Sequence, residues 1–276
     1  MTTMNDLFDR YENECLPLLQ WRTQRDYHSI IIILRRHFGQ LTPREVTPRK
    51  VVDFLEVKTG RVHRNRMVTI LSTVFKKAIC KWCIEDDMRN PCTGVERWPM
   101  KPRSRYVTDA EFAAFRETVR PQVQMAMDLA LFTGQRQGDI IGLMWERVKT
   151  EGPRDRWHIE IDQSKTGRKL AIAISPAIEA VLDRAWLAKP HWPRKCVIRT
   201  KHGLQYTGDG FRAMWQRYMR AWIKAGNEDF HFHDLRAKAV SDNQSLEGAY
   251  LLAGHTDSKM TRKVYDRSRR MVQPLR

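Results

Sequence analysis

The sequence predicts a mainly α-helical protein with a small β-hairpin or sheet, an α+β fold in two domains. Over most of the 276 residues, apolar side chains recur at the three- and four-residue spacing of amphipathic helices. Two short alternating segments, 157–161 and 170–174, flank a turn-rich stretch and predict a hairpin. A basic segment with two prolines and no periodicity, 97–107, predicts a linker between a domain at 1–96 and a second domain at 108–276.

The first domain is predicted to be helical throughout. Gly39 follows one helical pattern as a stop signal, and Thr47 with Pro48 provides the N-cap and first turn of the next helix. The last pattern places apolar residues such as Met67 and Val74 on one face. We expect helices at 5–19, 23–38, 48–57 and 64–85.

The second domain begins at Thr108, which forms a capping-box pattern with Glu111. Gly134 is a stop signal, and a Ser-Pro pair opens a later helix. Trp215 and Trp222 lie seven residues apart on one helical face, a spacing typical of core positions. Besides the hairpin, we expect helices at 109–119, 121–133, 139–148, 176–188, 208–224, 233–243, 247–253 and 259–266.

The charge indicates a polyanionic partner. The formal net charge is +17, with +5 in residues 1–100 and +12 in residues 101–276, so both domains are basic. A protein that wraps nucleic acid gains affinity from each phosphate it neutralises. The simpler alternative is a basic soluble protein that binds no polyanion.

Composition also excludes several classes. The longest apolar run, 30–34, is far shorter than the roughly 20 residues of a membrane span. The N-terminus lacks the pattern of a secretion signal. Five cysteines, an odd number, fit a reduced cytoplasmic protein better than a disulfide scaffold. We expect Cys80, Cys83 and Cys92 to be buried thiols rather than zinc ligands, because a structural zinc site needs four ligands.

Short polar motifs in the second domain could carry chemistry. Alone, each has a common structural explanation: a surface arginine, a solubilising lysine, a core histidine, a packed tyrosine. Their order in a basic protein is more specific. The motifs are Thr133-Gly-Gln-Arg136-Gln-Gly-Asp139, Lys165 at the hairpin tip, His233-Asp-Leu-Arg236, Gly254-His255 and Tyr265.

This ordered set resembles the tyrosine recombinases, specifically the phage-type integrases. The family pattern is an arginine in T-G-x-R-x-x-[ED], a lysine on a β-hairpin, H-x-x-R, then G-H before a nucleophilic tyrosine. All of these positions are filled here. Residues 1–96 are similar to the family's helical, SAM-like core-binding domain, so the resemblance covers nearly the whole chain. It implies that residues 108–276 are the catalytic domain.

The resemblance implies a role for each residue. Arg136 and Arg236 would bind the non-bridging oxygens of a DNA phosphodiester, because a guanidinium forks onto two oxygens at once. Tyr265 would attack the phosphorus and form a covalent 3′-phosphotyrosyl link. Asp139 would support Arg136.

The remaining residues would move protons. His233 would help to accept the phenolic proton of Tyr265, and His255 would hydrogen-bond the phosphate. Lys165 would protonate the departing 5′ oxygen. The resemblance implies no cofactor and no metal ion.

The resemblance also implies partners and a location in the cell. The partners would be double-stranded DNA at attachment sites, three further copies in a homotetramer and, in some reactions, a host DNA-bending protein or an excision factor. We expect the protein in the cytoplasm, associated with the nucleoid, and without an arm-type DNA-binding domain. Candidate DNA contacts are Arg64, Arg66, Lys76, Lys77, Lys101, Arg103 and Arg105.

Three alternatives remain open at this point. A type IB topoisomerase-like or resolvase-like enzyme would use the same residues without exchanging partners. A DNA-binding regulator on the same fold would lack the chemistry. A metal-dependent nuclease could use His231, His233 and His255, although Arg236 beside them disfavours a bound cation.

Overall fold

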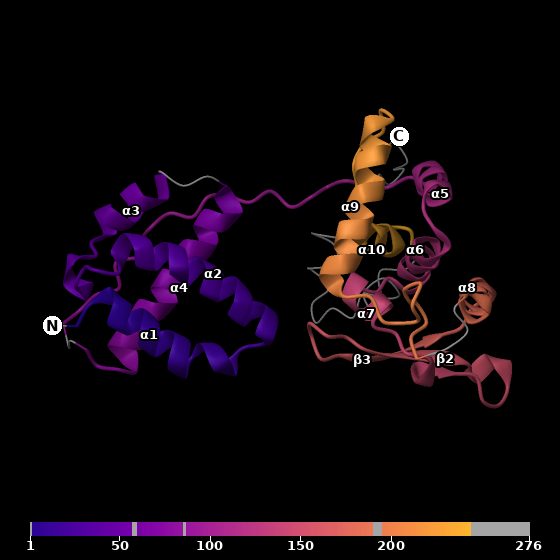
Figure 1. Cartoon of the computed structure of the whole chain (residues 1–276), viewed down its shortest axis with the longest axis horizontal. Helices are drawn as coiled ribbons and strands as arrows, with labels where there is room; N and C mark the ends of the chain where they lie inside the picture. Colours follow the sequence, from indigo (N-terminus) through magenta and orange to yellow (C-terminus); the bar gives the residue numbers. More distant parts are fainter. Residues whose placement is uncertain (1, 57–59, 85–86, 190–194, 244–276) are drawn as a thin grey trace, which may run out of the picture. The chain divides into compact units, whose positions relative to one another are not determined.

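The computed structural model describes residues 2–56, 60–84, 87–189 and 195–243 (Figure 1). The chain divides into two compact units, Met1–Lys101 and Pro102–Arg276, with the division inside the predicted linker. His255, Tyr265 and the predicted helices near them lie outside the described residues.

The described part of the N-terminal unit is built of helices around one core (Figure 1). Phe38 and Phe54 meet edge to face there, with ring centroids 5.0 Å apart, and Leu34, Val74 and Phe75 are fully buried. The α-helices are α1 (Met4–Glu14), α2 (Trp21–Phe38), α3 (Pro48–Glu56) and α4 (Arg61–Cys80), with 3-10 turns at Leu16–Leu18 and Pro43–Glu45.

Two predicted helices in this unit have the wrong bounds. The predicted helix 5–19 stops at Glu14, because Pro17 has no amide hydrogen and the chain passes into the 3-10 turn. The predicted helix 64–85 runs instead from Arg61 to Cys80. Beyond it, Cys83 has a φ of 48°, a conformation that no α-helix contains.

Gly39 stops α2 for a different reason from the one expected. Its φ is −55°, which is right-handed and open to any residue. A Cβ at Gly39 would overlap the main-chain oxygen of Arg35 and the side-chain oxygen of Asn5. The glycine is therefore needed where the start of α1 passes the end of α2, and the amide of Asn5 donates to its carbonyl at 3.0 Å.

The cysteine prediction is partly wrong. Cys92 is buried, but Cys80 and Cys83 are exposed. Cys80 is the last residue of α4, and Cys83 lies beyond the helix. Burial raises the pKa of the Cys92 thiol to about 12.

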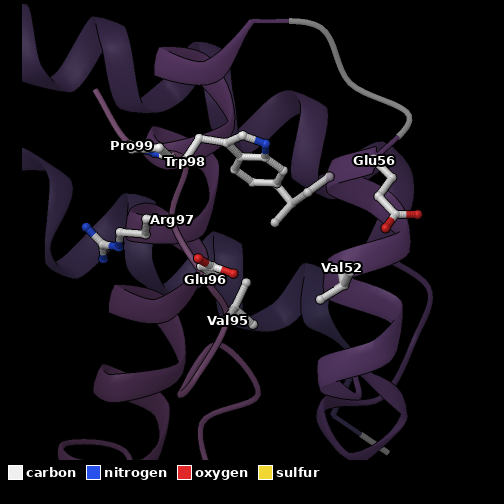
Figure 2. A pocket seen from close by; sticks show the side chains of 8 residues that line it. Val52, Glu56, Val95, Glu96, Arg97, Trp98 and Pro99 are labelled. Carbon is white, nitrogen blue, oxygen red and sulfur yellow. The ribbon is translucent and has the colours of Figure 1, made fainter. Parts of the chain in front are cut away.

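The beginning of the predicted linker packs on the N-terminal unit. Asn65 on α4 donates to the Trp98 carbonyl at 2.9 Å and accepts from the Trp98 amide at 3.0 Å. The guanidinium carbon of Arg64 lies 4.8 Å from the centre of the Trp98 ring. A pocket of about 350 Å³ lies beside this segment, lined in part by Val52, Glu56 and Val95 (Figure 2). Trp98, although part of the predicted linker, is therefore held against α4.

The second unit combines helices with a small sheet (Figure 1). The sheet order is β1-β2-β3 and both pairings are antiparallel, with Ile159 opposite Ile172 and Ile161 opposite Leu170. The described elements are α5 (Asp109–Thr118), α6 (Pro121–Thr133), α7 (Gln137–Ile141), β1 (Val148–Lys149), β2 (His158–Asp162), β3 (Lys169–Ala173), α8 (Pro176–Leu187), α9 (Gly208–Lys224) and α10 (Phe232–Ser241). The predicted fold class, mainly α with a small sheet, is confirmed.

The predicted helix 139–148 is wrong in extent. α7 ends at Ile141, and the chain continues through a 3-10 turn at Trp145–Arg147 into β1. Val148 pairs with Ile159 there, since a β-branched side chain suits a strand. Apolar residues spaced for a helix also fit a short helix followed by a turn and a strand.

The second core is centred on α6, which packs against both α8 and α10. Ala126, Met127 and Leu129 on this helix are fully buried. Phe115 contacts Trp215 and Trp222 with ring centroids 5.0 and 5.4 Å apart, so the prediction that both tryptophans are core residues is confirmed.

Among the described helices, none is both long enough and apolar enough to cross a membrane.

Candidate active site

The turn between α6 and α7 positions the first motif arginine. Gly134 ends α6 with a φ of 62°, the left-handed conformation that glycine adopts without steric cost. Thr133 is buried and donates from its hydroxyl to the Leu129 carbonyl at 2.5 Å. Arg136 then occupies the N-cap position of α7 and is partly exposed.

The second motif arginine reaches the same turn from α10, a helix that packs against α6. Arg236 lies on α10 and is 1% exposed. Its Nη1 donates to the Gly134 carbonyl at 2.7 Å. Folding therefore brings the segments around Arg136 and Arg236, 100 residues apart in the sequence, to one glycine.

The hairpin is tied to Arg136 through Gln163. Arg136 Nη1 donates to Gln163 Oε1 at 3.0 Å, and Thr166 Oγ1 donates to the same oxygen at 2.8 Å. Gln163 Nε2 donates to Gln135 Oε1 at 2.8 Å. Both glutamines are 1% exposed, so this polar network is buried between the hairpin and the turn.

Motif matching missed both Gln135 and Gln163. The alternation of β2 contained a signal for one of them, because Ile159 and Ile161 face the core and Gln163 is the next inward position. A polar side chain on an inward position needs a buried partner, which here is the network around Arg136.

Asp139 fastens the hairpin to α7. Its Oδ1 accepts from the Ser164 amide at 3.0 Å and from the Ser164 hydroxyl at 2.9 Å, and the residue is 8% exposed. We expected this carboxylate to support Arg136. In the described contacts its carboxylate bonds Ser164 on the hairpin and not that guanidinium. Its influence on Arg136 therefore passes through the hairpin.

Among the predicted catalytic residues that the structure describes, Lys165 and His233 are exposed. Lys165 follows Ser164 at the hairpin tip, where Gly167 has a φ of 68°. His233 lies in the first turn of α10, three residues before the buried Arg236. The structure therefore brings the hairpin, the α6–α7 turn and α10 together, with Lys165 and His233 exposed to solvent.

Two linker arginines are held by carboxylates of the second unit. Arg103 Nε donates to Asp234 Oδ2 at 2.8 Å. Arg105 pairs with Glu111 and, at 3.1 Å, with Glu228. Both arginines were candidate DNA contacts in the basic linker, and in the structure both bond neighbouring carboxylates.

The other candidate DNA contacts lie in the N-terminal unit. Arg64 stacks on Trp98, and Arg66 forms an ion pair with Asp26 at 3.5 Å. Lys76, Lys77 and Lys101 are exposed.

A buried cation that the sequence analysis missed lies two residues beyond Arg236. Lys238 is 1% exposed and bonds Asp109 at 2.6 Å and Asp242 at 2.8 Å. Burial alone would lower the pKa of this ammonium, but its hydrogen bonds to both carboxylates and to Tyr106 raise the pKa above the ordinary value. Its charge therefore persists in the folded protein at neutral pH.

In the ranges that the structure describes, no three His, Cys, Asp or Glu side chains cluster as a metal site would require. The functional groups that converge there are guanidinium, ammonium, imidazole and amide groups. Such a set suits an oxyanion, since each of these groups can donate a hydrogen bond and most can carry positive charge.

Known proteins resemble this chain in sequence. The integrase of Escherichia phage HK022 is 29% identical over 186 residues, which cover 65% of this chain and 50% of that protein. The integrase of Escherichia phage lambda is 26% identical over 185 residues, with the same two coverages. A shufflon-specific DNA recombinase of Escherichia coli is 26% identical over 259 residues, 87% of this chain and 61% of that protein.

Solved structures share the fold. A lambda integrase tetramer bound to a Holliday junction matches with a TM-score of 0.80 and 22% identity, over 99% of this chain and 80% of that chain. The Tn1549 transposon integrase in complex with circular intermediate DNA matches with a TM-score of 0.72 and 16% identity, over 95% and 94%.

The extent of these matches differs between the comparisons. The chain spans about half the length of the HK022 and lambda integrases. The sequence model of the phage integrase family matches residues 109–271, more than half of the chain and all of the motifs from Arg136 to Tyr265. The expected resemblance is thus confirmed, and the chain belongs to the phage integrase family.

Proposed function

We propose that this protein is a site-specific DNA recombinase that breaks and rejoins DNA through a 3′-phosphotyrosyl intermediate. The observation that carries the proposal is the joining of three motifs at one place. Arg236 bonds Gly134, and Arg136 bonds the base of the hairpin that bears Lys165. A motif match in sequence alone would not require these contacts.

The two arginines would bind the scissile phosphate. Each guanidinium can give a forked pair of hydrogen bonds to non-bridging oxygens, and both would stabilise the additional charge of the pentavalent transition state. Arg136 is well placed for this because Gln163 takes only one of its donors in the described contacts. Asp139, by fastening the hairpin to α7, would hold this arrangement together.

Tyr265 would be the nucleophile and Lys165 the general acid. A phenol has an ordinary pKa of about 10, so attack at neutral pH needs a proton acceptor, a role we give to His233. Lys165, at the exposed hairpin tip, would protonate the 5′ oxygen as its bond to phosphorus breaks. His255 would bond a phosphate oxygen. The phosphotyrosyl bond conserves the energy of the broken linkage, so no cofactor is needed.

Double-stranded DNA is the proposed substrate, with residues 1–96 as a core-binding domain and 108–276 as the catalytic domain. Exposed cations support this, among them Lys76 and Lys77 on α4 and Lys101 in the linker. The solvent side of α9 adds Arg217, Arg220 and Lys224. Such charges would exchange counterions for backbone phosphates.

The proposed assembly is a homotetramer at two attachment sites, aided where required by a host bending protein or an excision factor. The matching lambda integrase structure is a tetramer on a Holliday junction, which supports this assembly. Its substrate would place the protein in the cytoplasm, at the nucleoid.

A suicide substrate tests the proposal. The attachment-site duplex carries a nick close to the scissile phosphate, so that the short cleaved strand diffuses away and the covalent complex accumulates. The wild-type protein should form an adduct that resists denaturation, and mass spectrometry of the digest should find the nucleotide on Tyr265. Tyr265→Phe should bind the duplex but form no adduct.

Three other outcomes would contradict the proposal, and two of them would identify a rival. An adduct that forms with Tyr265→Phe would contradict the proposal. A wild-type protein that relaxes supercoiled DNA as a monomer would be a topoisomerase-like enzyme. A protein that binds the site and never forms an adduct would be a regulator.

A further inference from the structure

The end of the linker forms hydrogen bonds with both ends of α10, the helix that carries His233 and Arg236. At its start, Arg103 Nε donates to Asp234 Oδ2 at 2.8 Å. At its end, the hydroxyl of Tyr106 donates to Asp242 Oδ1 at 2.6 Å. Four linker residues, 103–106, therefore span the helix from its first turn to its C-cap.

Asp234 is the structural centre of the first attachment. It is 2% exposed and is the third residue of α10, directly after His233. Its Oδ2 also accepts from the His231 amide at 2.8 Å, so it closes the capping box at the helix start. One carboxylate thus fixes the backbone from which His233 projects.

Arg103 stabilises this carboxylate in its buried position. A buried carboxylate is costly unless it is paired and hydrogen-bonded, and the guanidinium supplies both charge and a donor. The other arm of Arg103, Nη2, donates to the Asp229 carbonyl at 3.1 Å, just before α10 begins. The side chain therefore links the linker, the loop before α10 and the first turn of α10.

We propose that Arg103 is a positioning residue for strand cleavage, acting through Asp234 on the placement of His233 and Arg236. The inference rests on the proposed recombinase function, since it assumes that these two side chains act on the scissile phosphate. It replaces the expectation that Arg103 binds DNA. A misplacement of about 1 Å at a reacting group can reduce the rate by about a hundredfold.

The test separates DNA affinity from chemistry in the full-length protein. Single-turnover cleavage of the nicked attachment-site duplex is measured at saturating protein, and the dissociation constant is measured separately by gel shift. Arg103→Ala should reduce the saturated rate by about ten- to a hundredfold. Its dissociation constant for DNA should equal that of a control variant that loses the same charge elsewhere. Arg103→Lys, which keeps the charge and one donor, should recover part of the rate.

The matched control is Arg154→Ala. Arg154 forms an ion pair with Glu179 at 2.7 Å in the same unit, so its loss removes the same charge and an arginine–carboxylate pair, but one that is exposed. Because exposed pairs contribute little, its saturated rate should stay within about twofold of wild type.

A double-mutant cycle with Asp234→Asn completes the design. The asparagine can still accept from the His231 amide but cannot form the ion pair. It should reproduce the rate loss of Arg103→Ala, and the double variant should lose no more than either single variant. Should Arg103→Ala unfold, the cycle is run with Arg103→Lys, whose smaller rate loss should likewise not add to that of Asp234→Asn.

Two results would overturn the inference. One is a wild-type saturated rate in Arg103→Ala with weakened affinity, which would make Arg103 a DNA contact. The other is multiplying losses in the double variant, which would make the two residues independent. Both results can be read only if the wild-type protein forms its covalent adduct. Failure of the recombinase proposal would show first as a wild-type protein that forms no adduct.

Discussion

Arg236 Nη1 and the main-chain oxygen of Gly134 form a 2.7 Å hydrogen bond that satisfies a carbonyl at the C-terminal end of α6. The last carbonyls of a helix lack partners within it, and a cation there is favourable. Arg236 therefore has a structural function in addition to its proposed catalytic one. Arg136, which is partly exposed, bonds a side chain of the hairpin and not a helix end.

This difference predicts that the two arginines respond differently to removal. Arg136→Ala and Arg236→Ala should each reduce saturated cleavage by about a hundredfold or more, the typical effect of losing one group that stabilises transition-state charge. Only Arg236→Ala should also lower the free energy of unfolding, by about 1–3 kcal/mol, because it leaves a buried carbonyl unsatisfied.

Urea unfolding and single-turnover cleavage measure the two effects on the same proteins. Equal stability of the two variants would show that the Arg236–Gly134 bond contributes nothing to the fold. Arg236→Lys provides a control, since a lysine keeps the charge but loses the planar fork.

The site was partly predictable from the sequence, and the reason is chemical. Residues that bind a phosphate are of a few types, so pattern alone could propose Arg136, Lys165 and Arg236 as candidates. Residues that position them can be any polar group of the right length. Gln163 and Ser164 have no signature beyond their place at the end of a strand, and only the folded hairpin shows their partners.

The fold was predictable where a local signal had one interpretation. The Thr108–Glu111 capping box forms as predicted, with both reciprocal hydrogen bonds, and Gly134 ends α6 in the left-handed conformation. The segment 139–148 was mispredicted because apolar spacing does not separate a continuous helix from a short helix that leads into a strand. Tertiary pairing of Val148 with Ile159 decides between them.

Gln163 provides the second prediction. Gln163→Ala removes the acceptor for Arg136 and the donor to Gln135, so the guanidinium loses its fixed orientation. Saturated cleavage should fall by about tenfold or more while DNA affinity changes little.

Thr166→Val is the matched control, because it removes only the hydroxyl that donates to the same glutamine oxygen. Its cleavage rate should lie near that of wild type. A Gln163→Ala protein that cleaves as fast as Thr166→Val would show that Arg136 needs no support from the hairpin.

Lys165 provides the third prediction, which concerns the leaving group. If Lys165 is the general acid, Lys165→Ala should cleave ordinary DNA about 10²–10⁴-fold more slowly. A substrate with sulfur in place of the bridging 5′ oxygen should remove most of this defect. A thiol has a pKa of about 8.5, so its thiolate can leave without being protonated.

Arg136→Ala is the control for the sulfur substrate. Its defect concerns the charge on the non-bridging oxygens and should persist with sulfur at the bridging position. Rescue of both variants to the same degree would mean that the sulfur substrate is cleaved faster whichever residue is missing. Lys165 would then no longer be assigned as the general acid.

The last prediction concerns the pH dependence of the N-terminal unit. Glu14, at the end of α1, accepts hydrogen bonds from Arg10 at 2.6 Å, Lys81 at 2.9 Å and Trp82 at 3.0 Å. These bonds lower the pKa of the Glu14 carboxyl from 4.5 to about 2. Because the folded pKa is depressed, the charged form stabilises the fold at pH values above 4.5, and this stabilisation is lost as the pH falls from 4.5 toward 2.

Glu14→Gln should therefore weaken protection of α1 and the end of α4 at pH 6, and much less at pH 3. Hydrogen–deuterium exchange of the full-length protein, read at the same pH for wild type and variant, cancels the intrinsic pH dependence of exchange. Asp53→Asn, which breaks the exposed pair with Arg49 at 2.9 Å, should change little at either pH. A difference between wild type and Glu14→Gln that stays constant from pH 6 to pH 3 would show that the contacts of Glu14 do not depend on its charge.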